Sequence, residues 1–198
     1  MSGIISFIKR KILRDPRERW NYQFEKGRWD GLGSAPELIR QKVVQSYFTK
    51  YKEGGSLLEL GCGQGHLVDA VFEKKHFSSY LGVDLADVAI EAARKRVGSE
   101  KIRFQQGDMN ALNINQRFDV VLFNESINYA KDCHAVLSNA IKNFLNKDGI
   151  FIVSMHEHKR SPEIWQAVDD LFNILDQQLV EIGEHKWRVK ALKPKLVG

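Results

Sequence analysis

The feature that most constrains the fold of this chain is a short apolar run that ends in three closely spaced glycines. Residues 57–60 have the sequence Leu-Leu-Glu-Leu and are followed at once by Gly61-Cys62-Gly63-Gln64-Gly65. A buried strand that passes through a glycine-rich turn into a helix is typical of an open α/β sheet, in which ligands bind at the carboxyl ends of strands. The sequence therefore predicts a ligand-binding junction at residues 59–65.

Short apolar runs alternate with amphipathic stretches from residue 56 onward, which is the pattern of βαβ units around a parallel sheet. The expected strands cover residues 56–60, 80–84, 102–106, 119–123, 149–155, 174–182 and 187–192. The expected helices cover residues 36–51, 66–73, 87–97, 132–145 and 162–171, with a turn at 146–149 in which Gly149 is free to take a positive φ. We therefore expect an α/β fold with a seven-stranded, mostly parallel sheet, an antiparallel last strand and helices on both faces.

The first 35 residues are expected to form a segment of their own, ahead of a single domain at 36–198. Residues 3–13 carry apolar side chains at helical spacing among Lys and Arg, which predicts an amphipathic helix. This helix is too short and too charged to span a bilayer. We expect its apolar face to pack on the domain or on a second copy, or to make peripheral contact with a membrane surface. Residues 15–34 are rich in aromatic and charged side chains without a clean period, so we expect a structured loop there.

Composition narrows the function classes only a little. Hydrophobic residues make up 43% and charged residues 28%, as in an ordinary globular protein. The net charge is +5, but much of the excess lies at residues 9–19 and 186–195, which indicates solvated basic ends more than a nucleic-acid groove. The two cysteines, Cys62 and Cys133, form neither a CxxC pair nor a disulfide framework, so a cytoplasmic location is expected.

Residues around the glycine loop distinguish between possible nucleotide-like ligands. A dinucleotide fingerprint needs Gly or Ala at position 66, where His66 stands, and no Gly-Lys-Ser/Thr sequence follows the glycines to cradle a triphosphate. Instead, Glu59 precedes the glycines, Asp84 ends the second expected strand and Asp108 follows the third. Carboxylates in these places can accept hydrogen bonds from the ribose hydroxyls and the exocyclic amine of an adenosine.

The order of these elements resembles class I S-adenosylmethionine-dependent methyltransferases, whose first motif, ExGxGxG, is similar to residues 59–65. The resemblance covers about 36–192 and looks closest to small bacterial methyltransferases of saccharide or natural-product assembly. It implies a Rossmann-like sheet and S-adenosyl-L-methionine as the cofactor. It also implies that the cofactor contacts the following residues: Glu59, Gly61, Cys62, Gly63, Gly65, Asp84, Leu85, Asp108, Met109 and Asn124.

Two residues are candidates for the catalytic base. Residues 118–125 resemble the family's fourth motif, which implies that Glu125 lies near the transferred methyl group; its other possible roles are a helix start or a cofactor contact. His156 ends the fifth expected strand and can act as a base, contact the acceptor or be a plain surface histidine. His156 and His158 lack a convincing third ligand, so no metal is expected.

Aromatic residues in 20–30 stand where members of the family place a lid over the cofactor. Tyr22 and Trp29, with Tyr129, are therefore candidate lid or acceptor contacts, since aromatic faces attract a sulfonium cation. The alternative is that Trp20 and Trp29 only pack the N-terminal helices onto the sheet.

The expected function is methyl transfer to an oxygen or nitrogen atom of a small-molecule or saccharide acceptor, because the connections between strands are short and no substrate domain is visible. No NPPY-type motif follows the fourth strand, which disfavours methylation of DNA bases or protein glutamine. Two alternatives stay open: an RNA methyltransferase, and a non-catalytic methyltransferase-like partner subunit. Both a monomer and a homodimer are compatible with the sequence.

Overall fold

The structure is a computed structural model that describes residues 15–73 and 75–195. Its centre is a seven-stranded sheet with the order β3-β2-β1-β4-β5-β7-β6. β7 pairs antiparallel with β5 and β6, and the other pairings in the sheet are parallel. The strands are β1 (Ser56–Leu60), β2 (Ser79–Asp84), β3 (Ile102–Gln106), β4 (Phe118–Asn124), β5 (Leu145–His156), β6 (Phe172–Ile182) and β7 (His185–Pro194). The predicted sheet and its antiparallel last strand are confirmed.

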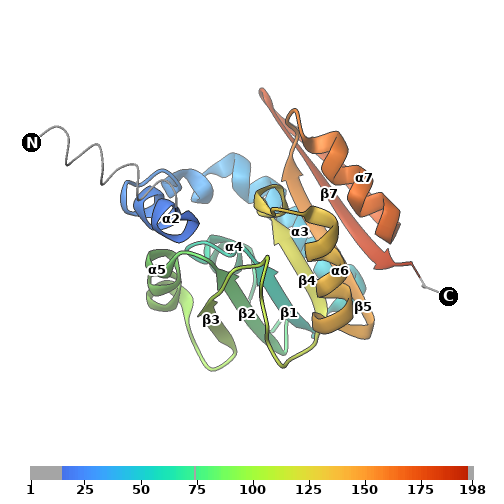
Figure 1. Cartoon of the computed structure of the whole chain (residues 1–198), viewed down its shortest axis with the longest axis horizontal. Helices are drawn as coiled ribbons and strands as arrows, with labels where there is room; N and C mark the ends of the chain where they lie inside the picture. The colour runs from blue at the N-terminus through green and yellow to red at the C-terminus, as the bar shows by residue number, and fades with distance from the viewer. Residues whose placement is uncertain (1–14, 74, 196–198) are drawn as a thin grey trace, which may run out of the picture.

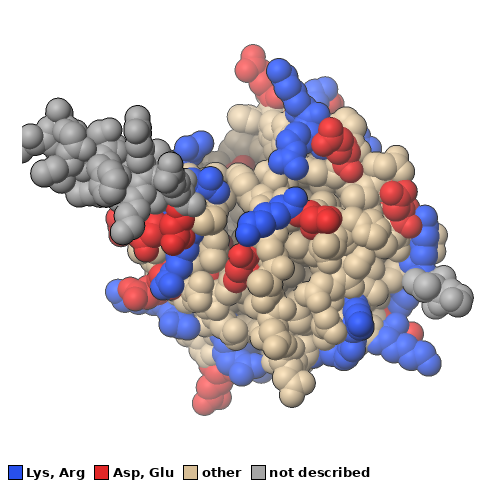
Figure 2. Space-filling view, in the orientation of Figure 1, with Lys and Arg blue, Asp and Glu red and all other residues tan. Residues whose placement is uncertain are grey.

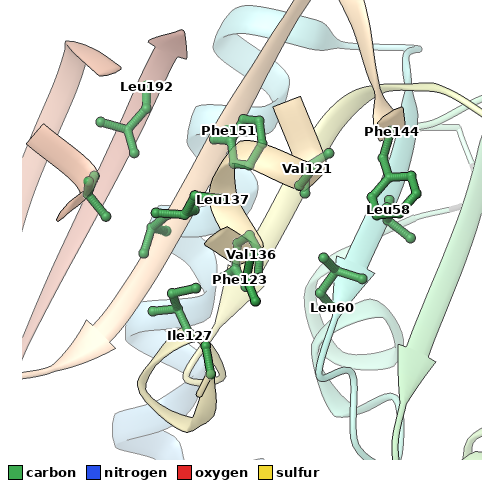
Figure 3. Packing of buried hydrophobic residues seen from close by; sticks show 14 of the residues in the cluster. Leu58, Leu60, Val121, Phe123, Ile127, Val136, Leu137, Phe144, Phe151 and Leu192 are labelled. Atoms are coloured by element: carbon green, nitrogen blue, oxygen red, sulfur yellow. The ribbon is translucent and has the colours of Figure 1, made fainter. Parts of the chain in front are cut away.

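Helices cover both faces of this sheet, as predicted (Figure 1). One core cluster lies between the sheet and α3, α4 and α5, and the other lies between the sheet and α6 and α7 (Figure 3). The central strands are apolar on both faces because both faces are buried, so they lack the alternation of a half-exposed strand. These helices are α3 (Ala35–Lys52), α4 (His66–Val71), α5 (Asp87–Val97), α6 (Cys133–Phe144) and α7 (Ser161–Leu171).

The segment expected to be a loop at residues 15–34 is largely helical, so that prediction was wrong. It forms α2 (Pro16–Glu25) and a short 3-10 helix, η1 (Asp30–Gly33). Asp15 caps α2 by accepting hydrogen bonds from the N–H groups of Arg17 and Glu18. Phe24 is the only residue of α2 that is fully buried, and so the helix carries almost none of the apolar periodicity by which helices are recognised.

The turn expected at residues 146–149 was also misassigned. β5 follows α6 directly, and residues 146–149 bulge out of it, because Phe118 pairs with Leu145 and Val120 pairs with Ile150. Gly149 does not take a positive φ. Glycine suits this position for a different reason: an added Cβ would approach Leu145 Cδ1 to 2.6 Å.

The N-terminal part of the described chain lies against the sheet's helical layer. α2 contacts α5, and Arg17 makes an ion pair with Asp87 at 2.7 Å (Figure 1). The amphipathic helix predicted at residues 3–13 lies outside the described residues. Within residues 15–73 and 75–195, no helix has the length and apolar character needed to cross a membrane.

Candidate functional site

A pocket of about 960 Å³, including its open mouth, lies at the carboxyl ends of the parallel strands. β1 connects to β2 on one side and pairs with β4 on the other, so the strand order reverses here, and such a switch point is where open α/β sheets bind ligands. The pocket brings together eleven residues that the sequence indicated: Trp29, Gly61, Cys62, Gly63, Asp84, Leu85, Asp108, Met109, Asn124, Glu125 and Tyr129.

The glycine loop can form only with glycine at its key positions. Gly61 has φ +82°, and an added Cβ would clash with the side chain of Ser126. Gly65 has φ +75° at the N-terminus of α4, and a Cβ there would approach Phe104 Cζ to 3.1 Å. Gly65 therefore shapes the turn from within the fold and does not line the pocket.

Asp84 is a pocket carboxylate whose two oxygens are both held by backbone N–H groups. Its Oδ2 accepts a hydrogen bond of 2.9 Å from the N–H of Gly63, and its Oδ1 accepts one of 2.9 Å from the N–H of Ala86. Burial raises its pKa, and the backbone hydrogen bonds oppose that shift. Each oxygen keeps a further lone pair, so the carboxylate can accept from two neighbouring hydroxyl groups.

Asp108 and Met109 occupy the pocket wall beyond β3. Asp108 Oδ1 accepts hydrogen bonds from the N–H of Asn110 at 2.9 Å and from Asn110 Nδ2 at 2.6 Å, which fixes the orientation of the carboxylate. Met109 and Leu85 add apolar surface to the same pocket. A carboxylate together with apolar side chains suits a flat heterocycle that carries an amine.

Glu59 lies beneath the loop and does not line the pocket. Its Oε2 accepts a hydrogen bond of 2.5 Å from Tyr80 Oη, and its Oε1 accepts one of 3.4 Å from Asn124 Nδ2. The side chain is 1% exposed, and burial raises its pKa to about 7 against the opposing effect of these hydrogen bonds. In this arrangement Glu59 supports Asn124, which does reach the pocket.

Arg40 is a functional candidate that the sequence did not indicate. It lines the pocket with 1% of its surface exposed, and Nη1 donates hydrogen bonds to Asn124 Oδ1 and to Ser154 Oγ. Its Nε and Nη2 both donate to Glu37 Oε2. Arg40 thus ties α3 to the ends of β4 and β5. A sign was present in the sequence, because Arg40 precedes Val44 and Phe48 at four-residue spacing, on the buried stripe of α3.

Glu125 combines a strained backbone with an unusual side-chain environment. Its φ of +59° makes it the only residue besides glycine with a positive φ in the described part of the chain. Such strain is concentrated at functional sites. Oε2 accepts from the N–H of His156 at 3.0 Å, and Oε1 lies 3.9 Å from Arg40 Nη1. Burial raises the pKa of Glu125 to about 7, while Arg40 opposes the shift.

His156 contributes to the site through its backbone rather than its side chain. The imidazole does not line the pocket; it packs edge-on against Trp187 at 5.5 Å and His185 at 5.7 Å. In the part of the chain that the structure describes, no three His, Cys, Asp or Glu side chains gather as metal ligands.

An aromatic wall closes the pocket on the side of α2. We use this name for Trp20, Trp29 and Tyr129, whose rings lie within 6.5 Å of one another. Phe24 extends the wall, and all four residues line the pocket. Tyr22 does not take part: it is 41% exposed, with Lys26 over its ring. Trp20 and Trp29 also pack with Phe24 against α5, so these two tryptophans have a packing role, and their role as a lid over the cofactor stays a prediction.

Two polar atoms in the pocket are buried without a hydrogen-bond partner among the described residues. They are Trp29 Nε1, a donor, and Gln41 Oε1, an acceptor. The Gln41 amide is oriented because its Nε2 donates to the carbonyl oxygen of Leu32 at 3.1 Å. Buried polar atoms are nearly always paired in proteins, which makes Trp29 and Gln41 candidates for contact with a ligand of the pocket.

The fold and this pocket define a class I S-adenosylmethionine-dependent methyltransferase. The chain belongs to the family described as methyltransferase domain, which matches residues 51–191. It is accordingly a methyltransferase, with S-adenosylmethionine as its cofactor.

Several curated relatives are named for a malonyl acceptor. The chain is 23% identical over 187 residues to a malonyl-[acyl-carrier protein] O-methyltransferase of Priestia megaterium, over 83% of this chain and 68% of that protein. It spans about half to two thirds of the length of the curated relatives of that name that it matches.

Two solved structures show the same fold at low sequence identity. The N-methyltransferase NodS of Bradyrhizobium japonicum, in complex with S-adenosyl-L-homocysteine, has a TM-score of 0.72 and 14% identity, over 84% of this chain and 91% of NodS. A complex of the Haloferax volcanii Trm112 methyltransferase activator with a putative methyltransferase gives a TM-score of 0.68 and 17% identity, over 87% of this chain and 98% of the matched chain.

Proposed function

We propose that this chain transfers the methyl group of S-adenosylmethionine to an oxygen or nitrogen atom of a small-molecule or saccharide acceptor. The observation that carries the proposal is that one pocket joins a glycine loop, an oriented carboxylate at Asp84 and a partly buried carboxylate at Glu125. The names of similar proteins include both oxygen and nitrogen methylation, which supports leaving both atoms in the proposal.

Each side of the cofactor has matching residues in this proposal. Asp84 accepts hydrogen bonds from the ribose hydroxyls, and Asp108 accepts one from the adenine amine between Leu85 and Met109. The backbone of residues 61–63 and the Asn124 side chain hold the methionyl part. Glu59 and Gly65 act indirectly, since Glu59 supports Asn124 and Gly65 shapes the loop.

The bound cofactor supplies an electrophilic methyl group on a sulfonium, so the chain itself has to position the acceptor and remove its proton. Glu125 fits the second task, because its carboxylate lines the pocket and its pKa near 7 allows it to accept a proton at neutral pH. His156 holds the Glu125 carboxylate through its backbone N–H, which favours Glu125 over His156 as the base. The aromatic wall excludes water from the reacting atoms.

Binding and transfer test the proposal separately. Titration calorimetry should detect binding of S-adenosylmethionine and S-adenosylhomocysteine, and Asp84→Ala should abolish it. Asp148→Ala, at an exposed position in the bulge of β5, is the matched control and should bind like the wild type. Tritiated cofactor offered to fractionated small-molecule, glycan and RNA pools then identifies the acceptor. A protein that binds neither ligand would refute the proposal.

The same pools decide between this proposal and its rivals. Transfer to the RNA pool with steeply salt-dependent affinity would mark an RNA methyltransferase. On the face shown in Figure 2, however, Lys and Arg are interspersed with Asp and Glu, which favours a small acceptor. Cofactor binding without transfer to any pool, restored when a partner is added, would mark a subunit that works as part of a complex.

A further inference from the structure

Glu37, at the first turn of α3, is the ion-pair partner of Arg40, which lines the pocket. Its Oε2 accepts hydrogen bonds from Arg40 Nε at 3.1 Å and from Arg40 Nη2 at 2.5 Å. The Arg40 side chain is 1% exposed and that of Glu37 is 17% exposed, so water screens this ion pair weakly. Glu37 is neither a lining residue of the pocket nor part of the glycine loop.

The guanidinium of Arg40 has little capacity left for an acceptor. It carries five N–H groups, of which two point to Glu37, one to Asn124 and one to Ser154. Glu125 is a second carboxylate beside the same cation, at 3.9 Å. One buried positive charge thus faces two carboxylates, and the cluster is negative when both are ionised.

Two other residues that line the pocket, Gln41 and Tyr129, add no positive charge that could attract a carboxylate. Gln41, the residue after Arg40, lines the pocket and is 2% exposed; its Oε1 is buried without a hydrogen-bond partner among the described residues, and its Nε2 donates to the carbonyl oxygen of Leu32. Tyr129 belongs to the aromatic wall; burial raises the pKa of its hydroxyl, and the charge of the nearby Glu125 adds to that shift. Carboxylates beside aromatic faces are the usual surroundings of an ammonium group.

We infer that the acceptor is an amine rather than a carboxylic acid, with Glu37 as the residue that sets this preference by neutralising Arg40. The inference rests on the proposed function and specifies its substrate class. It separates this chain from the similar proteins that are named for a malonyl acceptor, whose free end is a carboxylate.

The reaction balances with groups already described. The protonated amine of the acceptor gives one proton to Glu125 and becomes a neutral nucleophile. Its nitrogen lone pair forms the new N–C bond to the methyl group, and the electron pair of the breaking C–S bond stays on sulfur, which becomes a neutral thioether. The product is the methylated ammonium form of the acceptor.

Two matched sets of probes test the inference on the full chain saturated with S-adenosylhomocysteine. One set is glucosamine, glucose and glucuronate; the other is phenethylamine, phenethyl alcohol and hydrocinnamate. Calorimetry measures binding, and tritium transfer from S-adenosylmethionine measures methylation. The amine should bind about tenfold more tightly than the carboxylate of its set. A preference for the carboxylate, equal affinities, or no binding of either amine would overturn the inference.

Variants show whether Glu37 acts through charge. Glu37→Gln should shift the ratio of amine to carboxylate affinity about tenfold toward the carboxylate. Glu37→Asp, which keeps the charge, should restore the preference. Glu163→Gln is the matched control, since Glu163 also lies in a first helical turn after a proline, and it should leave the ratio unchanged. An unaltered ratio in folded Glu37→Gln would overturn the role of Glu37.

The two proposals fail in different ways. Absence of S-adenosylhomocysteine binding refutes the proposed function, whereas binding with transfer to carboxylates refutes only the inference about the acceptor. The wild-type affinity ratio needs no variant, so it decides the acceptor class even where Glu37→Gln does not fold.

Discussion

Replacing Glu59 by glutamine is expected to make the free energy of unfolding less sensitive to pH between 4.5 and 7. Burial raises the pKa of this carboxyl from 4.5 to about 7 in the folded state. In the unfolded chain the carboxyl is solvated and keeps its ordinary pKa, so in this window only the folded state binds the proton. The contribution of Glu59 to the free energy of unfolding is therefore neutral below pH 4.5 and becomes unfavourable as the pH rises to 7.

The size of the effect follows from the pKa shift. One pKa unit corresponds to about 1.4 kcal/mol, so the buried Glu59 carboxylate costs roughly 3 kcal/mol of stability above pH 7. Glutamine carries no charge, and its amide can accept from Asn124 Nδ2 and donate to Tyr80 Oη, the two partners of the carboxylate. We expect Glu59→Gln to match the wild type at pH 4.5 and to exceed it by roughly 3 kcal/mol at pH 8.

Urea denaturation at half-unit steps from pH 4.5 to 8 measures this difference. Glu91→Gln, an exposed substitution on α5, is the control and should follow the wild-type curve. The pKa of Glu125 is raised as well, so the stability of Glu59→Gln should keep part of the wild-type dependence on pH. If the free energy of unfolding of Glu59→Gln depended on pH as steeply as that of the wild type, the buried carboxylate would not be desolvated as described. The same would follow if the variant were less stable than the wild type at pH 8.

Three further predictions concern the pocket. Glu125→Gln should lower kcat/KM about 100-fold without changing the affinity for S-adenosylhomocysteine. Wild-type activity should rise through pH 7 as Glu125 loses its proton, and a flat pH profile would argue against Glu125 as the base. Gly61→Ala should cost about 2 kcal/mol more than Gly54→Ala in thermal denaturation, because both glycines have a positive φ but only at position 61 would a Cβ meet another side chain. Trp29→Ala should weaken S-adenosylhomocysteine binding by about 1 kcal/mol in calorimetry, and unchanged affinity would reduce the aromatic wall to a packing role.

Several elements of the fold and site were predictable because their signals are local. The Leu-Leu-Glu-Leu run and its glycines specify a strand and a turn within ten residues. Asp84, at the end of β2, and Asp108, two residues after β3, are equally visible. Parallel strands end on the same edge of a sheet, so local signals also placed these carboxylates on the same rim as Glu125.

The helical state of residues 16–25 could not be recovered in the same way. α2 is capped by Asp15 but buries only Phe24 fully, and its tryptophan faces the pocket. Periodicity detects a helix that packs one continuous stripe on a core, and α2 has no such stripe. The bulge at 146–149 was missed for a related reason, because it depends on pairing with β4, which no local pattern encodes.

By itself, the sequence determined the sheet, the glycine loop and the three acidic positions around it, since each is written in a few consecutive residues. Only the tertiary structure decided which side chains complete the pocket. Arg40 is 84 residues from Asn124 and 114 from Ser154, and its hydrogen bonds exist only because α3 lies across the ends of β4 and β5. A buried arginine on a helix face breaks the apolar pattern from which burial is inferred, so its partners, and the charge they leave for an acceptor, become visible only once the chain is folded.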